Sequence, residues 1–277
     1  MDADRSRHLP EVRGDLPELG LDGGDAAGAQ GQAHRHIVPI MCTVAVSFEP
    51  SSPVPLLVLA VRDELLVRPW EPPAEHWPRH PGVLGGIDLV AGGTWLAVDP
   101  AARRAGFVLN GRGRLAPEHG RRSRGDLPLL AAAGLPVPDD LGAFDPFYLI
   151  AADLGGAVMV GWDGETRTET ALPQGYTVIV NSGDDPAEPR AAHLLAALRA
   201  VPRPHPAAGW GAWPALAAGE GIDREDPRAL ILRHTFGDDL RYGSSSVTLL
   251  AIGPDLVRYD FASVPDEPGP VALTRVV

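Results

Sequence analysis

The sequence predicts an α+β fold in which sheets pack together and helices lie outside them. Most of the chain alternates apolar and polar residues as β-strands do, and helical spacing of apolar residues recurs only in short segments. Strands come first along the chain, then helices, then strands again, which is typical of layered α+β folds. With 277 residues, 44% of them hydrophobic, the chain is long enough to bury a sizeable core.

The first 41 residues differ from the rest of the chain. They mix charged residues with Gly, Ala, Gln and His and have no sustained helical or strand period, so they cannot contribute a packed face. We therefore expect residues 1–41 to be a disordered leader or a misannotated N-terminal extension. A single domain is expected over residues 42–277.

The pattern changes abruptly at Met41. Residues 42–48 alternate as a strand, a connection rich in Pro and Ser follows, and residues 56–62 form a second apolar strand. Together these segments predict a β-hairpin that begins at Cys42.

The remaining elements follow from the same patterns. The proline-rich residues 68–86 predict a long ordered loop. Further strands are expected at residues 94–98, 106–110, 147–152, 157–162, 165–170 and 176–181, with a turn at Asp163-Gly164. Helices are expected at residues 126–133, ended by Gly134, and at 187–201 and 228–234, before strands at 245–252, 256–261 and 271–277.

The composition excludes several classes of function. A net charge of -12 disfavours nucleic-acid and anionic-membrane partners, because those are bound by clustered basic residues. The chain contains no lysine, which removes a Walker lysine, a Schiff base and a Ser-Lys dyad. The single cysteine excludes an intramolecular disulfide and a Cys-rich zinc site, so we expect no metal centre. No apolar run reaches the length of a membrane span or a signal peptide, which predicts a cytoplasmic protein that handles a small molecule.

Cys42 is the candidate reactive residue. It follows Met41 and opens a predicted strand, so removal of an initiator methionine there would make Cys42 the first residue. An N-terminal cysteine carries its own base, because an α-amino group with a pKa of about 7.7 to 8.0 can take the thiol proton. The alternative is that a lone cysteine is a small buried hydrophobe.

A set of short motifs, taken in order, resembles one known family. The motifs are Met41-Cys42-Thr43, Ala60-Val61-Arg62-Asp63-Glu64, Arg68-Pro69 with Trp77, Gly85-Gly86-Ile87-Asp88, Gly92-Gly93-Thr94-Trp95-Leu96, Gly106-Phe107-Val108-Leu109-Asn110, Ser123-Arg124-Gly125 and the segment 175–181. Their order is similar to that in the NRDE family, the bacterial relatives of the transport and Golgi organisation 2 proteins. Val61 departs from the signature asparagine, and Gly243-Ser244-Ser245-Ser246 replaces a Gly-Thr-Arg sequence of relatives, for which Arg241 is a possible substitute.

The resemblance implies a four-layer αββα sandwich like that of the N-terminal-nucleophile hydrolases. In their cysteine amidases a Cys is followed by Arg and Asp on the next strand and by two strand-end asparagines, and the corresponding residues here are Cys42, Arg62, Asp63, Asn110 and Asn181. Arg62 would stabilise a thiolate, Asp63 would hold the amino group, and the asparagines would donate to an oxyanion. Adjacent strand residues point to opposite faces, so only one of Arg62 and Asp63 is expected to face Cys42.

Each of these residues also has a simpler interpretation. The sequence Arg62-Asp63-Glu64 suits a solvated strand end, and both asparagines suit ordinary turns. Arg124 belongs to an arginine-rich stretch, residues 112–124, which is typical of a solvated loop but could receive an anionic substrate group. Arg124 and Arg241 are therefore the candidate substrate-binding residues.

Two functions remain open at this point. The first is an amidase-like hydrolase acting on a small amide or acyl substrate through Cys42, with no cofactor required. The second is a non-catalytic carrier or chaperone of haem or lipid, which the resemblance also implies. In that case Cys42 would be a thiolate ligand or an inherited relic, and haem would be a ligand met by the arginines.

Overall fold

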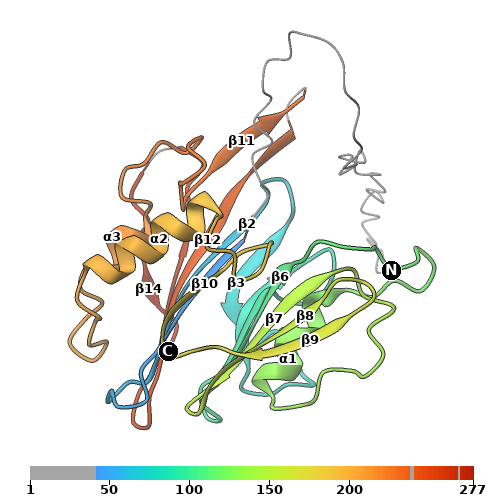
Figure 1. Ribbon diagram of the computed structural model, residues 1–277, viewed down its shortest axis with the longest axis horizontal. Coiled ribbons are helices and arrows are strands. Elements are labelled where there is room, and N and C mark those ends of the chain that lie inside the picture. Colours follow the sequence, from blue (N-terminus) through green and yellow to red (C-terminus); the bar gives the residue numbers. More distant parts are fainter. Residues whose placement is uncertain (1–41, 238–239, 268) are drawn as a thin grey trace, which may run out of the picture. The chain divides into compact units, whose positions relative to one another are not determined.

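The computed structural model describes residues 42–237, 240–267 and 269–277, which form two antiparallel sheets and a few helices (Figure 1). The α+β class predicted from the sequence is confirmed. The expected leader, residues 1–41, lies outside the described residues.

The first sheet contains the predicted hairpin at its centre. Its strands lie in the order β10-β1-β2-β12-β13-β14, and β11 pairs with β12. Their bounds are Gly175–Ile179 for β10, Thr43–Phe48 for β1, Leu56–Leu65 for β2, Leu240–Ile252 for β12, Val257–Ser263 for β13, Thr274–Arg275 for β14 and Arg233–Phe236 for β11. Strand β2 is therefore flanked by β1 on one side and by the long β12 on the other.

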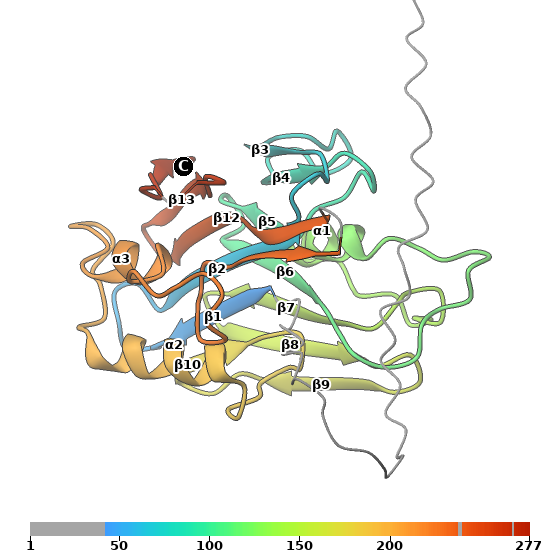
Figure 2. The same cartoon turned by 90° about the horizontal axis from the view of Figure 1, so that it is seen from above.

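The second sheet is a meander whose strands follow chain order from β3 to β9, as Figure 2 shows for β5 to β9. The strands are β3 Trp70–Ala74, β4 Leu84–Asp88, β5 Leu96–Asp99, β6 Arg104–Asn110, β7 Phe147–Asp153, β8 Gly156–Trp162 and β9 Arg167–Ala171. The predicted strand pair across Asp99-Pro100 and the hairpin turn at Asp163-Gly164 both form.

Strand alternation sorts the core into layers. Val44, Val46 and Val58 of the first sheet pack against Leu96, Phe107 and other residues of the second sheet. The opposite face of the first sheet packs on helices α2 (Pro189–Ala200) and α3 (Trp213–Ala217). Burial of apolar side chains on both faces explains why β1 and β2 are almost wholly buried.

Helix α1, Leu127–Ala132, lies on the outer face of the second sheet after the short 3-10 turn η1, Arg124–Asp126. Gly106 of β6 allows this contact, because a Cβ there would approach the Pro128 carbonyl oxygen to 2.4 Å. Gly134, with a φ of 67°, follows the helix as predicted, since its left-handed conformation suits glycine.

Three predictions of local structure were wrong. Residues 68–86 contain strand β3 and part of β4 instead of one loop, and Pro72 and Pro73 are accommodated because β3 is an edge strand. The expected helix at 228–234 is irregular and leads into β11. Its buried residues, 229–232, form a short apolar run, and such a run does not distinguish helix from strand. Only Thr274–Arg275 of the expected strand 271–277 is a strand.

Candidate functional site around Cys42

Strand pairing places Cys42 beside Arg62. Thr43 pairs with Val61 across the β1 and β2 hairpin, and the same register continued by one residue brings Cys42 opposite Arg62. Directly opposed residues of an antiparallel pair point to the same face, so the two side chains share the face that meets the second sheet.

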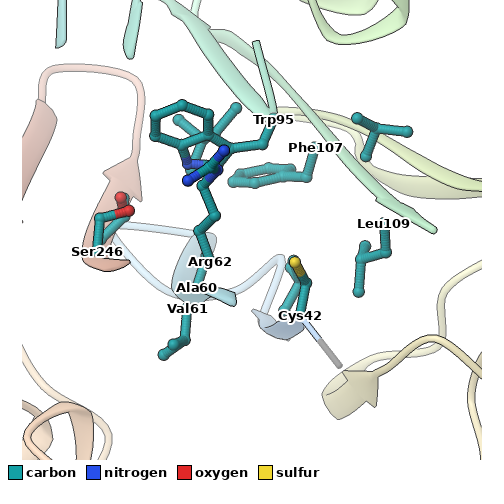
Figure 3. A pocket seen from close by; sticks show the side chains of 12 residues that line it. Cys42, Ala60, Val61, Arg62, Trp95, Phe107, Leu109 and Ser246 are labelled. Atoms are coloured by element: carbon teal, nitrogen blue, oxygen red, sulfur yellow. The ribbon is translucent and has the colours of Figure 1, made fainter. Parts of the chain in front are cut away.

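Cys42 and Arg62 both line a small cavity between the sheets (Figure 3). Its volume is about 10 Å³, which is about the space of one water molecule. The walls are mainly apolar and include Trp95, Phe107 and Leu109 from the second sheet. The partly buried Cys42 therefore borders a narrow, mainly apolar space that itself holds only the smallest groups.

The guanidinium of Arg62 is held by several partners. Its side chain is almost fully buried, Nη1 donates to the hydroxyl of Ser245 at 3.0 Å, and Nη2 donates to Asp88 Oδ2 at 3.2 Å. The group also lies 4.4 Å from the ring centroid of Trp95, within cation–π distance, as Figure 3 illustrates. Glu64 completes the set at 3.6 Å from Nη2. These contacts fix the orientation of Arg62 over the cavity.

A β-bulge in β12 supplies the hydroxyl partner. The pairing of β12 with β2 shifts between Ser244, which opposes Asp63, and Ser246, which opposes Arg62. The extra residue, Ser245, accepts from Arg62 Nη1 and donates to the Arg62 carbonyl at 3.2 Å. Bulges commonly redirect a side chain in this way.

Asp88 joins Arg62 to a second arginine. Arg68 donates to both carboxylate oxygens of Asp88, at 2.5 Å from Nε and 3.1 Å from Nη2. Burial alone would raise the pKa of Asp88, but the Arg68 hydrogen bond, the Ala91 amide and the charges of Arg68 and Arg62 bring it below its ordinary value. The carboxylate is therefore ionised and balances much of the positive charge beside the cavity.

Asp63 points to the other face of the sheet, towards the helices. Its buried carboxylate accepts from Arg190 Nη1 of α2 at 2.6 Å and from the Ser244 hydroxyl at 2.6 Å. Arg190 Nη1 also donates to Thr43 Oγ1 at 3.3 Å. Burial raises the pKa of Asp63 although Arg190 and Ser244 act to lower it. Strand alternation allowed only one of Arg62 and Asp63 to face Cys42. The Arg62 side chain lies on the face of Cys42, and the Asp63 side chain lies on the opposite face.

Ionisation of the Cys42 thiol is strongly disfavoured. Cys42 Sγ donates to the main-chain carbonyl of Asp63 at 3.5 Å. Burial first, and then the charge of Asp63, raise the pKa of the Cys42 thiol to about 12, while the positive charge of Arg62 lowers it by less. Arg62 therefore opposes the effect of burial but does not bring the thiol pKa below its ordinary value.

The two candidate asparagines lie on different faces of the fold. Asn181 is buried and lies in the turn that follows β10, where Val180 pairs with Gly183. Asn110, by contrast, is exposed and opposes Phe147, which packs on the outer face of the second sheet. Asn181 therefore follows the strand that pairs with β1, whereas the side chain of Asn110 lies on the outer face of the second sheet, away from Cys42.

The two candidate substrate-binding arginines also differ. Arg124 is half-buried, donates to the Pro146 carbonyl at 2.8 Å and is close enough for Cys42 to affect its pKa, which desolvation lowers. Arg241 lies at the exposed start of β12 and forms an ion pair with Asp266 at 3.2 Å. Arg124 thus lies near the cysteine, whereas the side chain of Arg241 is engaged elsewhere.

Several residues of this site were not singled out from the sequence. Asp88 and Arg68 were present in the recognised motifs but without a role, and Ser245 and Arg190 gave no signal because their contacts depend on strands and a helix distant in sequence. In the described ranges, no group of three His, Cys, Asp or Glu side chains is arranged to hold a metal ion. None of the helices seen in these ranges combines the length and apolarity required to cross a bilayer.

Comparison with known proteins identifies the family. No curated protein matches the chain. The family model described as Transport and Golgi organisation 2 matches residues 41–205, which is more than half of the chain and begins one residue before Cys42. The matched region contains β1, β2 and the whole second sheet, but it ends before the bulged strand β12. The chain therefore belongs to the Transport and Golgi organisation 2 family, as its motifs indicated.

Proposed function

We propose that the protein is an N-terminal-cysteine hydrolase that acts on a small amide or acyl substrate. The observation that carries this proposal is the shared cavity between the sheets, lined by the only thiol of the chain and by a buried guanidinium. The layer order, with helices outside two packed antiparallel sheets, is compatible with the αββα sandwich of N-terminal-nucleophile hydrolases. We place this activity in the cytoplasm.

The raised thiol pKa makes a dedicated base necessary. With a pKa of about 12, Cys42 is a neutral thiol at physiological pH and a poor nucleophile. When Met41 precedes it, the Cys42 nitrogen is an amide and cannot accept the proton. A free α-amino group, with a pKa of about 7.7 to 8.0, can. The proposed active form therefore begins at Cys42, with residues 1–41 absent.

The proposed reaction has two stages. In the first, the α-amino group takes the thiol proton, Sγ attacks the substrate carbonyl carbon, and the proton passes to the departing amine as the C–N bond breaks, leaving a thioester. In the second, water attacks the thioester, its proton goes to the α-amino group and then to the sulfur, and a carboxylic acid leaves. The buried Arg62 guanidinium is the proposed partner of the oxyanion. Neither Asn181, which is not among the residues lining the cavity, nor the exposed Asn110 side chain has a role in this scheme.

The cavity limits what can react there. A space of about 10 Å³ accommodates a single oxygen atom or a water molecule but not the body of a substrate. We propose that the reacting carbonyl oxygen enters this space and that the rest of the substrate lies outside, near Arg124. The guanidinium of Arg62, fixed by Asp88 and Ser245, would then stabilise negative charge without having to reorganise.

The test compares two forms of the protein: the full chain and a chain that begins at Cys42. Each is incubated with p-nitrophenyl acetate and with a panel of N-acyl amino acids, and the protein mass and product release are followed. Turnover with a transient acyl adduct on Cys42 is expected only in the shorter form. Cys42→Ala should abolish turnover and adduct, and full activity of the chain that starts at Met1 would refute the role of the amine.

The second candidate function is a non-catalytic carrier or chaperone of haem or lipid. The neutral thiol and the pairing of Arg62 with Asp88 favour it, because neither group is activated in the chain that retains Met41. Haem does not fit the cavity at Cys42, and a thiol with a pKa of about 12 is a poor thiolate ligand. Haem binding would therefore involve another surface, and a spectral shift on haem addition that survives Cys42→Ala, without hydrolysis, would support this function.

A further inference from the structure

A second, larger hollow lies on the helix side of the first sheet. It has a volume of about 680 Å³ and shares no lining residue with the cavity at Cys42. Asp260 of β13 is one of its lining residues, so we call it the Asp260 groove. Alternation along β13 explains the position, because Tyr259 and Phe261 point into the core between the sheets and Asp260 points the opposite way.

Two arginines converge on the single carboxylate of Asp260. Arg258 Nε donates to Oδ2 at 2.6 Å, and Arg275 Nε, from β14, donates to Oδ1 at 3.1 Å. The indole Nε1 of Trp210 also donates to Oδ2. The carboxylate is almost fully buried and accepts all three donors, so its hydrogen-bonding capacity is largely used.

The lining of the groove therefore carries one uncompensated positive charge, from two arginines and one aspartate. The side chain of Arg275 is 56% exposed, and within the described residues its two Nη groups make no hydrogen bond. Arg258 is more deeply placed and is fixed by the Pro206 carbonyl at 2.6 Å and by Trp210, with its guanidinium carbon 5.2 Å from the ring centroid.

The other walls of the groove are apolar. They come from Pro214 of α3, from Trp210 just before that helix, and from Val271 and Leu273 in the C-terminal segment. Val271 and Leu273 are only partly buried against the core that α2 and α3 cover. Arginine side chains beside partly exposed apolar walls can hold both the charged head and the apolar body of a small amphipathic anion.

We propose that the Asp260 groove binds a small monocarboxylate with a compact apolar body. The paired Nη groups of Arg275 match the two oxygens of a carboxylate, and the planar guanidinium favours such bidentate contacts. One excess positive charge balances one negative charge, which favours a carboxylate over a dianionic phosphate. The apolar body of the ligand would lie against Val271, Leu273 and Pro214. This proposal does not depend on any reaction at Cys42.

The test measures binding of hexanoate to the full chain by titration calorimetry at low ionic strength. Hexylamine and hexanol have the same apolar body with a cationic or neutral head, and inorganic phosphate tests the anion alone. One site for hexanoate is expected, with no measurable binding of hexylamine and weaker binding of hexanol and phosphate. Tighter binding of phosphate or hexanol than of hexanoate would overturn the proposed ligand class.

Arg275→Gln locates the site. Loss of one charge-assisted contact should weaken hexanoate binding roughly tenfold. Arg167→Gln is the matched control, because Arg167 is a partly exposed arginine on β9 of the other sheet that also has one acidic partner, Glu169. Unchanged affinity in Arg275→Gln, or an equal loss in Arg167→Gln, would place the binding elsewhere. Cys42→Ala should bind hexanoate with the affinity of the unsubstituted protein. Binding at the groove can therefore be judged independently of hydrolysis at Cys42.

Discussion

Arg62 and Asp63 are neighbours on β2, yet they belong to two different parts of the molecule. The side chain of Arg62 enters the space between the sheets, where it shares Asp88 with Arg68 and contacts Trp95 and Ser245. The side chain of Asp63 enters the layer under α2, where it meets Arg190 and Ser244. Both are at least 95% buried, and both are held by hydrogen bonds.

The two environments differ in how many partners share the charge. Asp88 keeps Arg68 as a partner if Arg62 is lost, and the Arg68 side chain is 30% exposed to solvent. Asp63 has Arg190 as its ion-pair partner, and that side chain is only 3% exposed. A buried charge that loses its counter-ion is far more costly than a shared, partly solvated one. The Asp63–Arg190 ion pair on the helix side therefore depends on a single counter-ion. In the cluster beside the thiol, Asp88 retains a second arginine when one is lost.

The largest effect is expected from Arg190→Met. The substitution leaves the Asp63 carboxylate buried without its counter-ion and should lower the free energy of unfolding by about 3 to 5 kcal/mol. Urea unfolding followed by circular dichroism measures the loss. Arg199→Met is the control, because Arg199 is an exposed arginine on the same helix. Adding Asp63→Asn to Arg190→Met should recover part of the lost stability, because it removes the unpaired charge. If Arg190→Met alone costs no more than Arg199→Met, Arg190 is not the counter-ion that stabilises Asp63.

A smaller loss is expected from Arg62→Met. The variant removes hydrogen bonds to Ser245 and Asp88 but leaves Asp88 bonded to Arg68, so we expect a decrease of about 1 to 3 kcal/mol. The same unfolding assay gives the value. If Arg62→Met destabilises the protein as much as Arg190→Met, the two faces are energetically equivalent and the proposed distinction fails.

The smallest effect on stability, and the most informative for chemistry, concerns the pH dependence of Cys42. Its pKa is raised from 9.0 to about 12, so the thiol of the unfolded chain ionises first. Stability contributed by the neutral thiol is therefore complete below pH 9 and is lost as pH rises towards 12. The rate of iodoacetamide alkylation should still increase about tenfold per pH unit between pH 9 and 10, because the thiolate is the reacting form.

Two variants sharpen this prediction in opposite directions. Asp63→Asn removes a negative charge that raises the thiol pKa, so alkylation should shift to lower pH. Arg62→Met removes a positive charge that lowers it, so alkylation should shift to higher pH. Intact-mass measurement of the full chain follows the single cysteine directly. A profile that reaches a plateau near pH 9, or shifts of the same sign in both variants, would show that burial does not control this thiol.

Local pattern was sufficient for many of the elements. Alternation gave the hairpin from Cys42 and the strands β6, β7 and β8, and helix α1 and its end at Gly134 followed from apolar spacing and the position of glycine. The proline-rich segment and residues 228–234 were misread, because prolines are tolerated in an edge strand and a buried apolar run suits either a helix or a strand. Whether a segment lies at an edge is a property of the assembled sheet.

For the site, the sequence by itself determined the reactive residue types, their order and the family to which they belong. It also determined that Arg62 and Asp63 would point to opposite faces, because strand periodicity is a local property of the backbone. Only the tertiary structure decided which of them would face Cys42, since that depends on the register of β1 against β2. It also decided the partners: the bulge at Ser245, Asp88 from the other sheet and Arg190 from α2 come from segments brought together only when the sheets and helices pack.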